Sequence, residues 1–207
     1  PHLVQRIGLF AFGHDFLRRA VELECLRTQA NQRQEHLVLA AYFDRQPFSR
    51  RKARDLPHHL LAADCYLDTA LILIDWDIFS HLCSNERYVL LSYWRTIEAH
   101  CHPAQQYELA WSEWSASGCG APVLAERGAL VATFFRERGE ADQAVVFLRR
   151  ALDAALAAWG RHHVNTVVIL TNLAVLHAEE GNRLQARLAR GLRRPAANPA
   201  AQRELVQ

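Results

Sequence analysis

The stretch "LVATFFRERGEADQA" at residues 130–144 decides the predicted fold, because "NLAVLHAEEGNRLQA" at residues 172–186 repeats its pattern 42 residues later. Three matched positions carry the same small residue in both segments: Ala132 and Ala174, Gly139 and Gly181, Ala144 and Ala186. Small side chains let two antiparallel helices approach closely, and glycine suits the turn between them. The register therefore predicts helix-turn-helix units that stack, since one unit cannot bury its apolar face alone.

The rest of the chain is also predicted to be helical. Ala, Leu, Arg, Glu and Gln dominate, and no stretch shows the clean alternation of polar and apolar residues that indicates a strand. We expect Asn31 to cap one helix and Pro57 to start or kink another. The expected helices before residue 118 are short and bounded by Asp, Asn, Ser or Pro, at 14–26, 31–46, 49–64, 66–74, 77–85, 86–100 and 103–117.

Composition excludes several classes of protein. The formal charge of +2 is too small for binding nucleic acid through bulk charge. No apolar run reaches the ~18 residues of a membrane span, because Asp75 and Asp77 interrupt the best one. Five cysteines without a CxxC pair favour a reducing, intracellular compartment. The absence of methionine indicates a piece cut from a longer polypeptide.

The strongest change of composition is "ASGCGAP" at 116–122, where two glycines and a proline break any helix. Longer, alanine-rich helices are expected beyond it. We therefore predict four parts: the end of a winged-helix-like segment at 1–30, a helical linker domain at 31–117, repeats at 118–190 and a flexible tail at 191–207.

The stretch "AVVFLRRALDAALAAWGRHHVNTVVILTNLAVLHAEEGN" at 144–182 resembles tetratricopeptide repeats of the 42-residue kind in kinesin light chains and nephrocystin. Three residues depart from the family pattern: Trp159, Val164 and His177. The positions that match it are Ala144, Leu148, Ala151, Leu152, Gly160, His163, Asn172, Leu173, Ala174 and Gly181. The resemblance implies one complete repeat and a second, incomplete one.

The N-terminal half resembles the segment that follows the nucleotide-binding module in NACHT-type signalling ATPases. Two clusters carry this resemblance: Phe12, His14, Leu17, Arg18, Ala20 and Val21, then Ala41, Tyr42, Phe43, Leu56, Pro57, His59 and Leu60. The chain has no G-x-x-x-x-G-K-[ST] loop, so an ATPase module would lie upstream in the same polypeptide.

Together the resemblances imply an all-α protein in which a helical region leads into a short tetratricopeptide-repeat-like, right-handed α-solenoid. They imply a non-catalytic scaffold that docks protein or peptide partners in a concave groove, with no cofactor or metal and no nucleic-acid or membrane partner. The implied location is cytoplasmic or ciliary. The alternative is a regulatory region that packs on the upstream nucleoside triphosphatase and restrains it.

In stacked repeats the first helix of each unit lines the groove. The resemblance places eight groove residues on these helices: Thr133, Arg136, Glu137, Val168, Thr171, Asn172, Val175 and Glu179. Asn172 has the most informative chemistry, because its amide both donates and accepts hydrogen bonds and can pair with a peptide backbone. A role in helix packing is an equally good interpretation of Asn172.

Other chemically suggestive residues have structural interpretations that we favour. His162 and His163 are expected to cap or pack a linker, and the stretch 100–102, "HCH", is expected to be a helix end beside a buried cysteine. No residue supplies the third group that a Cys-His nucleophile needs, so no catalytic residue is predicted.

Two further motifs are weighed in the same way. The basic run at 49–54 is interpreted as a solvated helix start near Asp55 rather than a phosphate contact. Tyr107, Trp111 and Trp114 form one helical stripe, which is expected to lie in the core rather than form an exposed aromatic platform.

Overall fold

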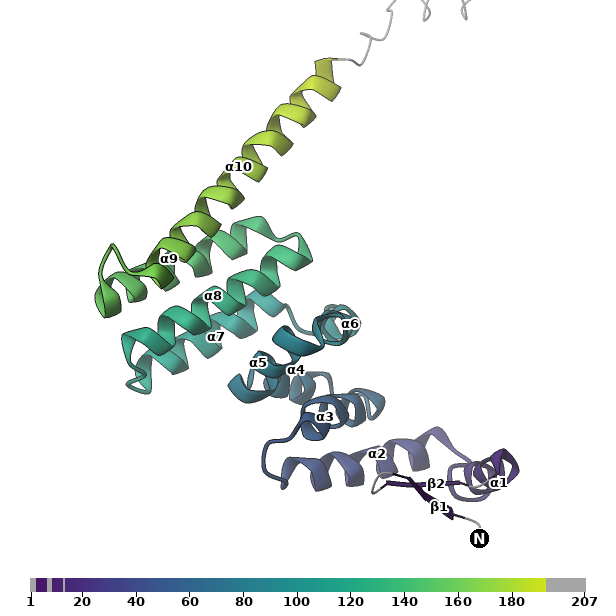
Figure 1. The fold of residues 1–207 in the computed structure, drawn as a ribbon. Coiled ribbons are helices and arrows are strands. Elements are labelled where there is room, and N and C mark those ends of the chain that lie inside the picture. The colour runs from purple at the N-terminus through teal and green to yellow at the C-terminus, as the bar shows by residue number, and fades with distance from the viewer. Residues whose placement is uncertain (1–2, 7–8, 13, 193–207) are drawn as a thin grey trace, which may run out of the picture. The chain divides into compact units, whose positions relative to one another are not determined.

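The structure is a computed structural model that describes residues 3–6, 9–12 and 14–192, with side chains described for 14–24, 26–179 and Gly181. Ten helices and one two-stranded sheet make up the described part (Figure 1). In chain order the elements are β1 (Leu3–Arg6), β2 (Leu9–Phe12), α1 (Asp15–Cys25), α2 (Gln29–Asp44), α3 (Arg50–Ala62), α4 (Tyr66–Ile74), α5 (Trp76–Asn85), α6 (Arg87–Ile97), α7 (Pro103–Ala116), α8 (Ala121–Arg138), α9 (Ala141–Trp159) and α10 (Val164–Leu192).

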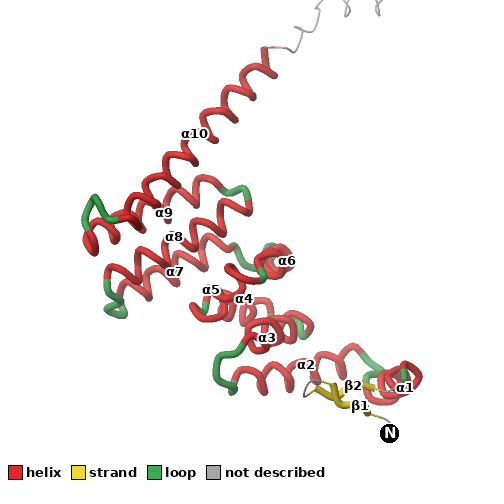
Figure 2. Tube along the Cα trace, viewed as in Figure 1, coloured by secondary structure: helices red, strands yellow, loops and turns green. Residues whose placement is uncertain are grey.

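The protein is helical, as predicted, except for the short hairpin at its start (Figure 2). Strands β1 and β2 pair antiparallel with Leu3 opposite Phe12 and Arg6 opposite Leu9. The prediction that the chain contains no strand was wrong here. The apolar residues of "LFAF" do not alternate with polar ones, so the usual signal of a half-buried strand is missing.

Helix starts depend on local capping. The Thr28 hydroxyl accepts the Asn31 N–H and begins α2, so the cap is Thr28 and the prediction of Asn31 as the cap was wrong. Ser49 caps α3 through the Lys52 N–H, and Asp75 caps α5 through the Ile78 N–H. Each cap satisfies a backbone donor that has no partner inside its helix.

The chain divides into two compact units, residues 1–113 and 114–207. The predicted boundary near residue 118 lies a few residues beyond this division. The predicted tail at 191–207 lies largely outside the described residues, which end at Leu192 within α10.

The core of the first unit is aromatic at its centre. Phe79 and Trp94 lie against Tyr107, with ring centroids 5.0 and 5.6 Å from it, and all three are buried. The Tyr107 hydroxyl donates to the Leu73 carbonyl at 3.3 Å, so its polar atom has a partner. Tyr107 is buried and Trp111 is half-buried in the first unit, and Trp114, the first residue of the second unit, is also buried. The burial of all three confirms the prediction that they do not form an exposed aromatic platform.

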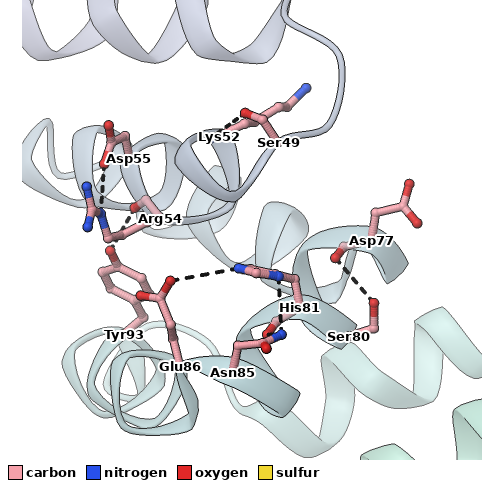
Figure 3. Close-up of polar contacts among 10 residues, drawn as sticks. All are labelled: Ser49, Lys52, Arg54, Asp55, Asp77, Ser80, His81, Asn85, Glu86 and Tyr93. Atoms are coloured by element: carbon pink, nitrogen blue, oxygen red, sulfur yellow. Dashed lines mark hydrogen bonds and ion pairs between the residues drawn. The ribbon is translucent and has the colours of Figure 1, made fainter. Parts of the chain in front are cut away.

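Pro57 lies inside α3 rather than at its start. Proline has no N–H to complete the helical ladder, which loosens the preceding turn. The Arg54 carbonyl in that turn accepts a hydrogen bond from the Tyr93 hydroxyl of α6 at 2.9 Å (Figure 3). This bond joins α3 to α6 in the turn that precedes Pro57.

The second unit contains the predicted helix pair. Gly139 ends α8 with φ +81°, and its N–H donates to the Arg136 carbonyl. Both helices carry small residues that are buried: Ala125, Gly128 and Ala132 on α8, and Ala144, Ala151 and Ala155 on α9. Phe135 stacks on Phe147 with ring centroids 5.5 Å apart, and both rings are fully buried. The first half of the 42-residue register therefore packs as predicted.

The second half of the 42-residue register does not form the predicted helix pair. Helix α10 runs without a break through Gly181, where the register predicted a turn (Figure 1). Ala174, the counterpart of the buried Ala132, is exposed, and the side chain of Ala186 lies outside the described residues. Asp142 lies in the first turn of α9 and favours a helix start there, whereas the equivalent stretch after Gly181 carries Arg183. A single glycine inside a helix costs only about 1 kcal/mol, so the helix continues.

Candidate functional site

A small pocket lies where α8, α9 and α10 meet. Its cavity volume is about 10 Å³, close to the minimum that one water needs. Its lining is Ala132, Thr133 and Arg136 from α8, Leu148 from α9, and Asn172 and Leu176 from α10. The pocket therefore admits one small group, such as a carbonyl or carboxylate oxygen, rather than a whole side chain.

Helical spacing positions the lining. Thr133 and Arg136 are three residues apart on α8, and Asn172 and Leu176 are four apart on α10, so each pair lies on one helix face. The start of α10 is anchored by Thr166, which is buried and donates to the Gly160 carbonyl at 2.9 Å. Ile169 and Leu176 are also buried, and this packing fixes α10 beside the helix pair.

Most polar side chains of the pocket have no hydrogen-bond partner among the described residues. Within the described residues, neither the half-buried Asn172 amide nor the exposed Arg136 guanidinium has a side-chain hydrogen bond or ion pair. The Thr133 hydroxyl donates to the Ala129 carbonyl at 3.0 Å and keeps lone pairs as acceptors. The pocket thus offers amide and guanidinium donors above an apolar base.

Three of the eight predicted groove residues meet in this pocket: Thr133, Arg136 and Asn172. Glu137 is half-buried elsewhere on α8. The remaining four are exposed on α10 and do not line the pocket: Val168, Thr171, Val175 and Glu179. Val168, Val175 and Glu179 share a face of α10 with Asn172 at spacings of four, three and seven residues, so they extend the surface beside the pocket, whereas Thr171 is the direct sequence neighbour of Asn172.

The apolar base of the pocket was not predicted as part of a site. Ala132, Leu148 and Leu176 are almost completely buried, and sequence analysis assigns such positions to packing. Their helical periodicity was available as a signal for burial, but it did not show that they would line the same pocket as the predicted groove residues Thr133, Arg136 and Asn172.

His163 and His100 make structural contacts. The His163 ring stacks on Trp159 with centroids 5.0 Å apart, and its Nδ1 accepts the Asn165 N–H at 3.2 Å, which confirms a capping and packing role. His100 stacks on Tyr66 at 4.0 Å beside the buried Cys101, as predicted for a helix end. Among residues with described side chains, no group of three or more His, Cys, Asp or Glu could hold a metal ion.

Two cysteine thiols lack the properties of a nucleophile. Desolvation by burial raises the pKa of Cys65, and the nearby Asp68 and Asp64 raise it further. Burial also raises the pKa of Cys101. Because the thiolate is the reactive form, both groups are poorly activated at neutral pH.

Figure 3 shows polar contacts among residues of α3, α5 and α6 and at the starts of α3 and α6. Asp55 accepts hydrogen bonds from Arg51 at 3.0 Å and Arg54 at 3.1 Å. Partial burial alone would raise the pKa of Asp55, but these two arginines outweigh burial and lower it. The basic run at 49–54 is therefore engaged in local capping and pairing, which confirms its interpretation as a solvated helix start.

Comparison of the chain with protein-family models, with curated proteins and with solved structures gave no match. None of the helices in the described part of the chain is both long and apolar enough to cross a membrane.

Proposed function

We propose that this chain is a non-catalytic protein-interaction module that docks a partner segment on the face formed by α8 and α10. The observation that carries the proposal is the convergence of Arg136 and Asn172, from helices distant in sequence, on one pocket with an apolar base. Uncommitted donors beside an apolar base suit recognition of a polar group on a partner chain.

The chemistry of the pocket indicates the kind of segment. A guanidinium favours a carboxylate, and a side-chain amide pairs with a peptide group. The pocket volume of about 10 Å³ limits the inserted group to an oxygen atom or a similar small group. The partner is therefore an extended segment with an acidic side chain or a terminal carboxylate, with Val168 and Val175 beside it as apolar contacts.

The helix arrangement supports the tetratricopeptide interpretation for one unit. We propose that α8 and α9 form one repeat and that the first part of α10 corresponds to the first helix of the next. The proposed link to an upstream NACHT-type ATPase, and with it a cytoplasmic or ciliary setting, rests on the sequence resemblance. Sequencing upstream of Pro1 and finding no phosphate-binding loop would remove that link.

A peptide array probed with the full chain tests the docking face. We expect the strongest spots to carry an acidic residue or a free C-terminal carboxylate. Arg136→Glu and Asn172→Ala should each weaken binding to those peptides by about fivefold or more, because loss of a central polar contact costs more than about 1 kcal/mol.

Matched controls come from the same helical unit. Arg149 is exposed on α9 and Asn165 is exposed on α10, and neither lines the pocket. Arg149→Glu and Asn165→Ala should therefore leave the spots unchanged. Equal binding by the Arg136 and Arg149 variants would rule out this face as the docking site.

A further inference from the structure

The first unit carries an apolar groove that is separate from the pocket described above. The groove runs along α2, α3 and α4 and has a cavity volume of about 330 Å³, within the range of ligand-binding pockets. Each helix contributes one face: Leu37, Ala40, Ala41 and Asp44 from α2, Leu56 and Leu60 from α3, and Asp68, Leu71 and Ile72 from α4. This volume has room for bulky aliphatic side chains.

The groove has a buried base and exposed walls. Ala40, Leu56 and Leu60 are buried, whereas 39% of Leu37 and 57% of Leu71 remain exposed. Exposed aliphatic groups gathered in one concave surface gain free energy when a partner removes them from water. Ala40 and Ala41 lie four and three residues from Asp44 and are small, so the main chain of a partner can approach α2 closely.

Two carboxylates make the groove negatively charged. Asp44 is the last residue of α2, and Asp68 lies in the first turn of α4. Neither carboxylate has an ion pair or hydrogen bond with any residue whose side chain is described. The nearby Lys52 ammonium donates to the backbone carbonyls of Asp44 and Gln46 at 2.7 and 2.9 Å. Acidic groups beside aliphatic ones attract cations and repel anions on a partner.

We propose that the α2–α4 groove docks an amphipathic helix of a partner protein that carries aliphatic side chains on one face and Arg or Lys flanking that face. The aliphatic residues fill the groove over Leu56 and Leu60, and the cations pair with Asp44 and Asp68. An apolar helix flanked by acidic residues is rejected, because its carboxylates meet Asp44 and Asp68. The groove residues on α2 lie three, four and seven residues from Leu37 and so share one face of that helix. A docked helix would present its own aliphatic anchors to this face at the same helical spacing.

Fluorescence anisotropy with a labelled probe peptide tests this proposal on the full chain. The probe is a helical peptide with leucines at every fourth position and an arginine at each end; its counterpart has glutamates in place of the arginines. We expect saturable binding of the arginine probe and at least about tenfold weaker binding of the glutamate probe at low salt. Raising the salt concentration should narrow that difference.

Matched variants identify the surface. Asp44→Asn and Asp68→Asn should each lower the affinity for the arginine probe by about two- to fivefold, which is the usual effect of losing an exposed charge pair. Asp77→Asn should have no effect, because Asp77 is an exposed first-turn acid of α5 outside the groove. Leu71→Glu should weaken binding by about tenfold or more, whereas Leu109→Glu, at a leucine that is also 57% exposed, should not.

Several outcomes would overturn the proposal. Equal affinity for the two probes would contradict the proposed charge preference. If neither probe bound, the proposal that the groove docks a helix would be wrong. Unchanged binding by Leu71→Glu, with an unaltered circular dichroism spectrum, places the probe elsewhere. Self-association of the chain that Leu71→Glu abolishes assigns the groove to a second copy. Arg136→Glu should not change probe binding, so failure here is distinguishable from failure of the α8–α10 docking face.

Discussion

His36 of α2 and His59 of α3 are joined by a hydrogen bond, with their Nδ1 atoms 2.9 Å apart. One of these nitrogens must carry the proton and the other must accept it, so the bond requires at least one neutral ring. His58 completes a cluster of three rings, with centroids 6.1 Å from His36 and 5.2 Å from His59. His59 also stacks on Phe43 at 5.7 Å. The packing of α2 on α3 therefore includes a hydrogen bond that is lost if both the His36 and the His59 rings are protonated.

The first prediction is that acid destabilises the first unit through this cluster. Burial lowers the pKa of His59, neighbouring His58, His36 and Arg51 lower it further, and Asp55 opposes them. Because the folded pKa lies below the unfolded value of about 6.5, the stabilisation is present above that pH and is lost as the pH falls through the folded pKa. We expect the urea midpoint to fall over this range, with about 0.5–1.5 kcal/mol attributable to the lost hydrogen bond.

The variant His36→Gln tests whether the histidine cluster causes the loss of stability in acid. It removes one partner of the bond and one neighbouring charge, so the urea midpoint should depend less on pH than in the wild type. His102→Gln, at an exposed position, should keep the wild-type dependence. Identical pH profiles for His36→Gln and the wild type would contradict the prediction.

The second prediction concerns Tyr93, whose hydroxyl supports the α3 turn before Pro57. Burial, assisted by Asp55, raises the pKa of Tyr93 to about 12. The protonated phenol is thus favoured by folding, and its contribution is lost as the pH rises from about 10 through about 12. Tyr93→Phe should cost about 1 kcal/mol at neutral pH and flatten this alkaline loss.

Ultraviolet absorbance at alkaline pH measures tyrosine ionisation directly, and thermal melts at neutral pH give the stability. Tyr88→Phe is the control, because Tyr88 is 82% exposed. It should leave the melting temperature unchanged. A Tyr93→Phe melt that overlays the wild-type melt would show that the bond to Arg54 contributes no stability.

The third prediction compares two glycines at equivalent register positions. Gly139 has φ +81°, so Gly139→Ala should destabilise the protein by about 1 kcal/mol. Gly181 lies within α10, and a methyl group there would meet nothing within 4 Å, so Gly181→Ala should stabilise α10 by about 0.5–1 kcal/mol. Helix content and thermal melts of both variants measure the contrast. Destabilisation by Gly181→Ala would instead indicate a turn at Gly181.

The two glycines show why sequence analysis succeeded for one helix pair and failed for the next. At Gly139 the turn is fixed by the packing of the next helix, because α9 places its alanines and Phe147 against α8. At Gly181 the same residue type and register recur without such described packing, and local propensity then decides the conformation. A repeated pattern indicates the conformations open to a segment, whereas the partner helix determines which of them forms.

For the candidate site, too, the sequence predicted some features and missed others. Helical periodicity and the family resemblance were sufficient to select Thr133, Arg136 and Asn172, which the structure brings together. The other groove residues were selected by the same argument, yet Val168 and Val175 remain exposed beside the pocket. Periodicity fixes the face of one helix, but the depth of a pocket depends on side chains from three helices. The hairpin of β1 and β2 was missed because pairing between short strands is not encoded in either strand alone.

The final prediction tests the close approach of α8 and α9. Ala132 and Ala144 are almost fully buried, so Ala132→Leu or Ala144→Leu should force the helices apart and cost about 1–3 kcal/mol. Ala174→Leu, at the matched but exposed position, should change stability by no more than about 0.5 kcal/mol. Urea titrations of the three variants give the free energies directly. If Ala132→Leu were as well tolerated as Ala174→Leu, small residues would not be required at the helix contact, and the 42-residue register would lose its physical basis.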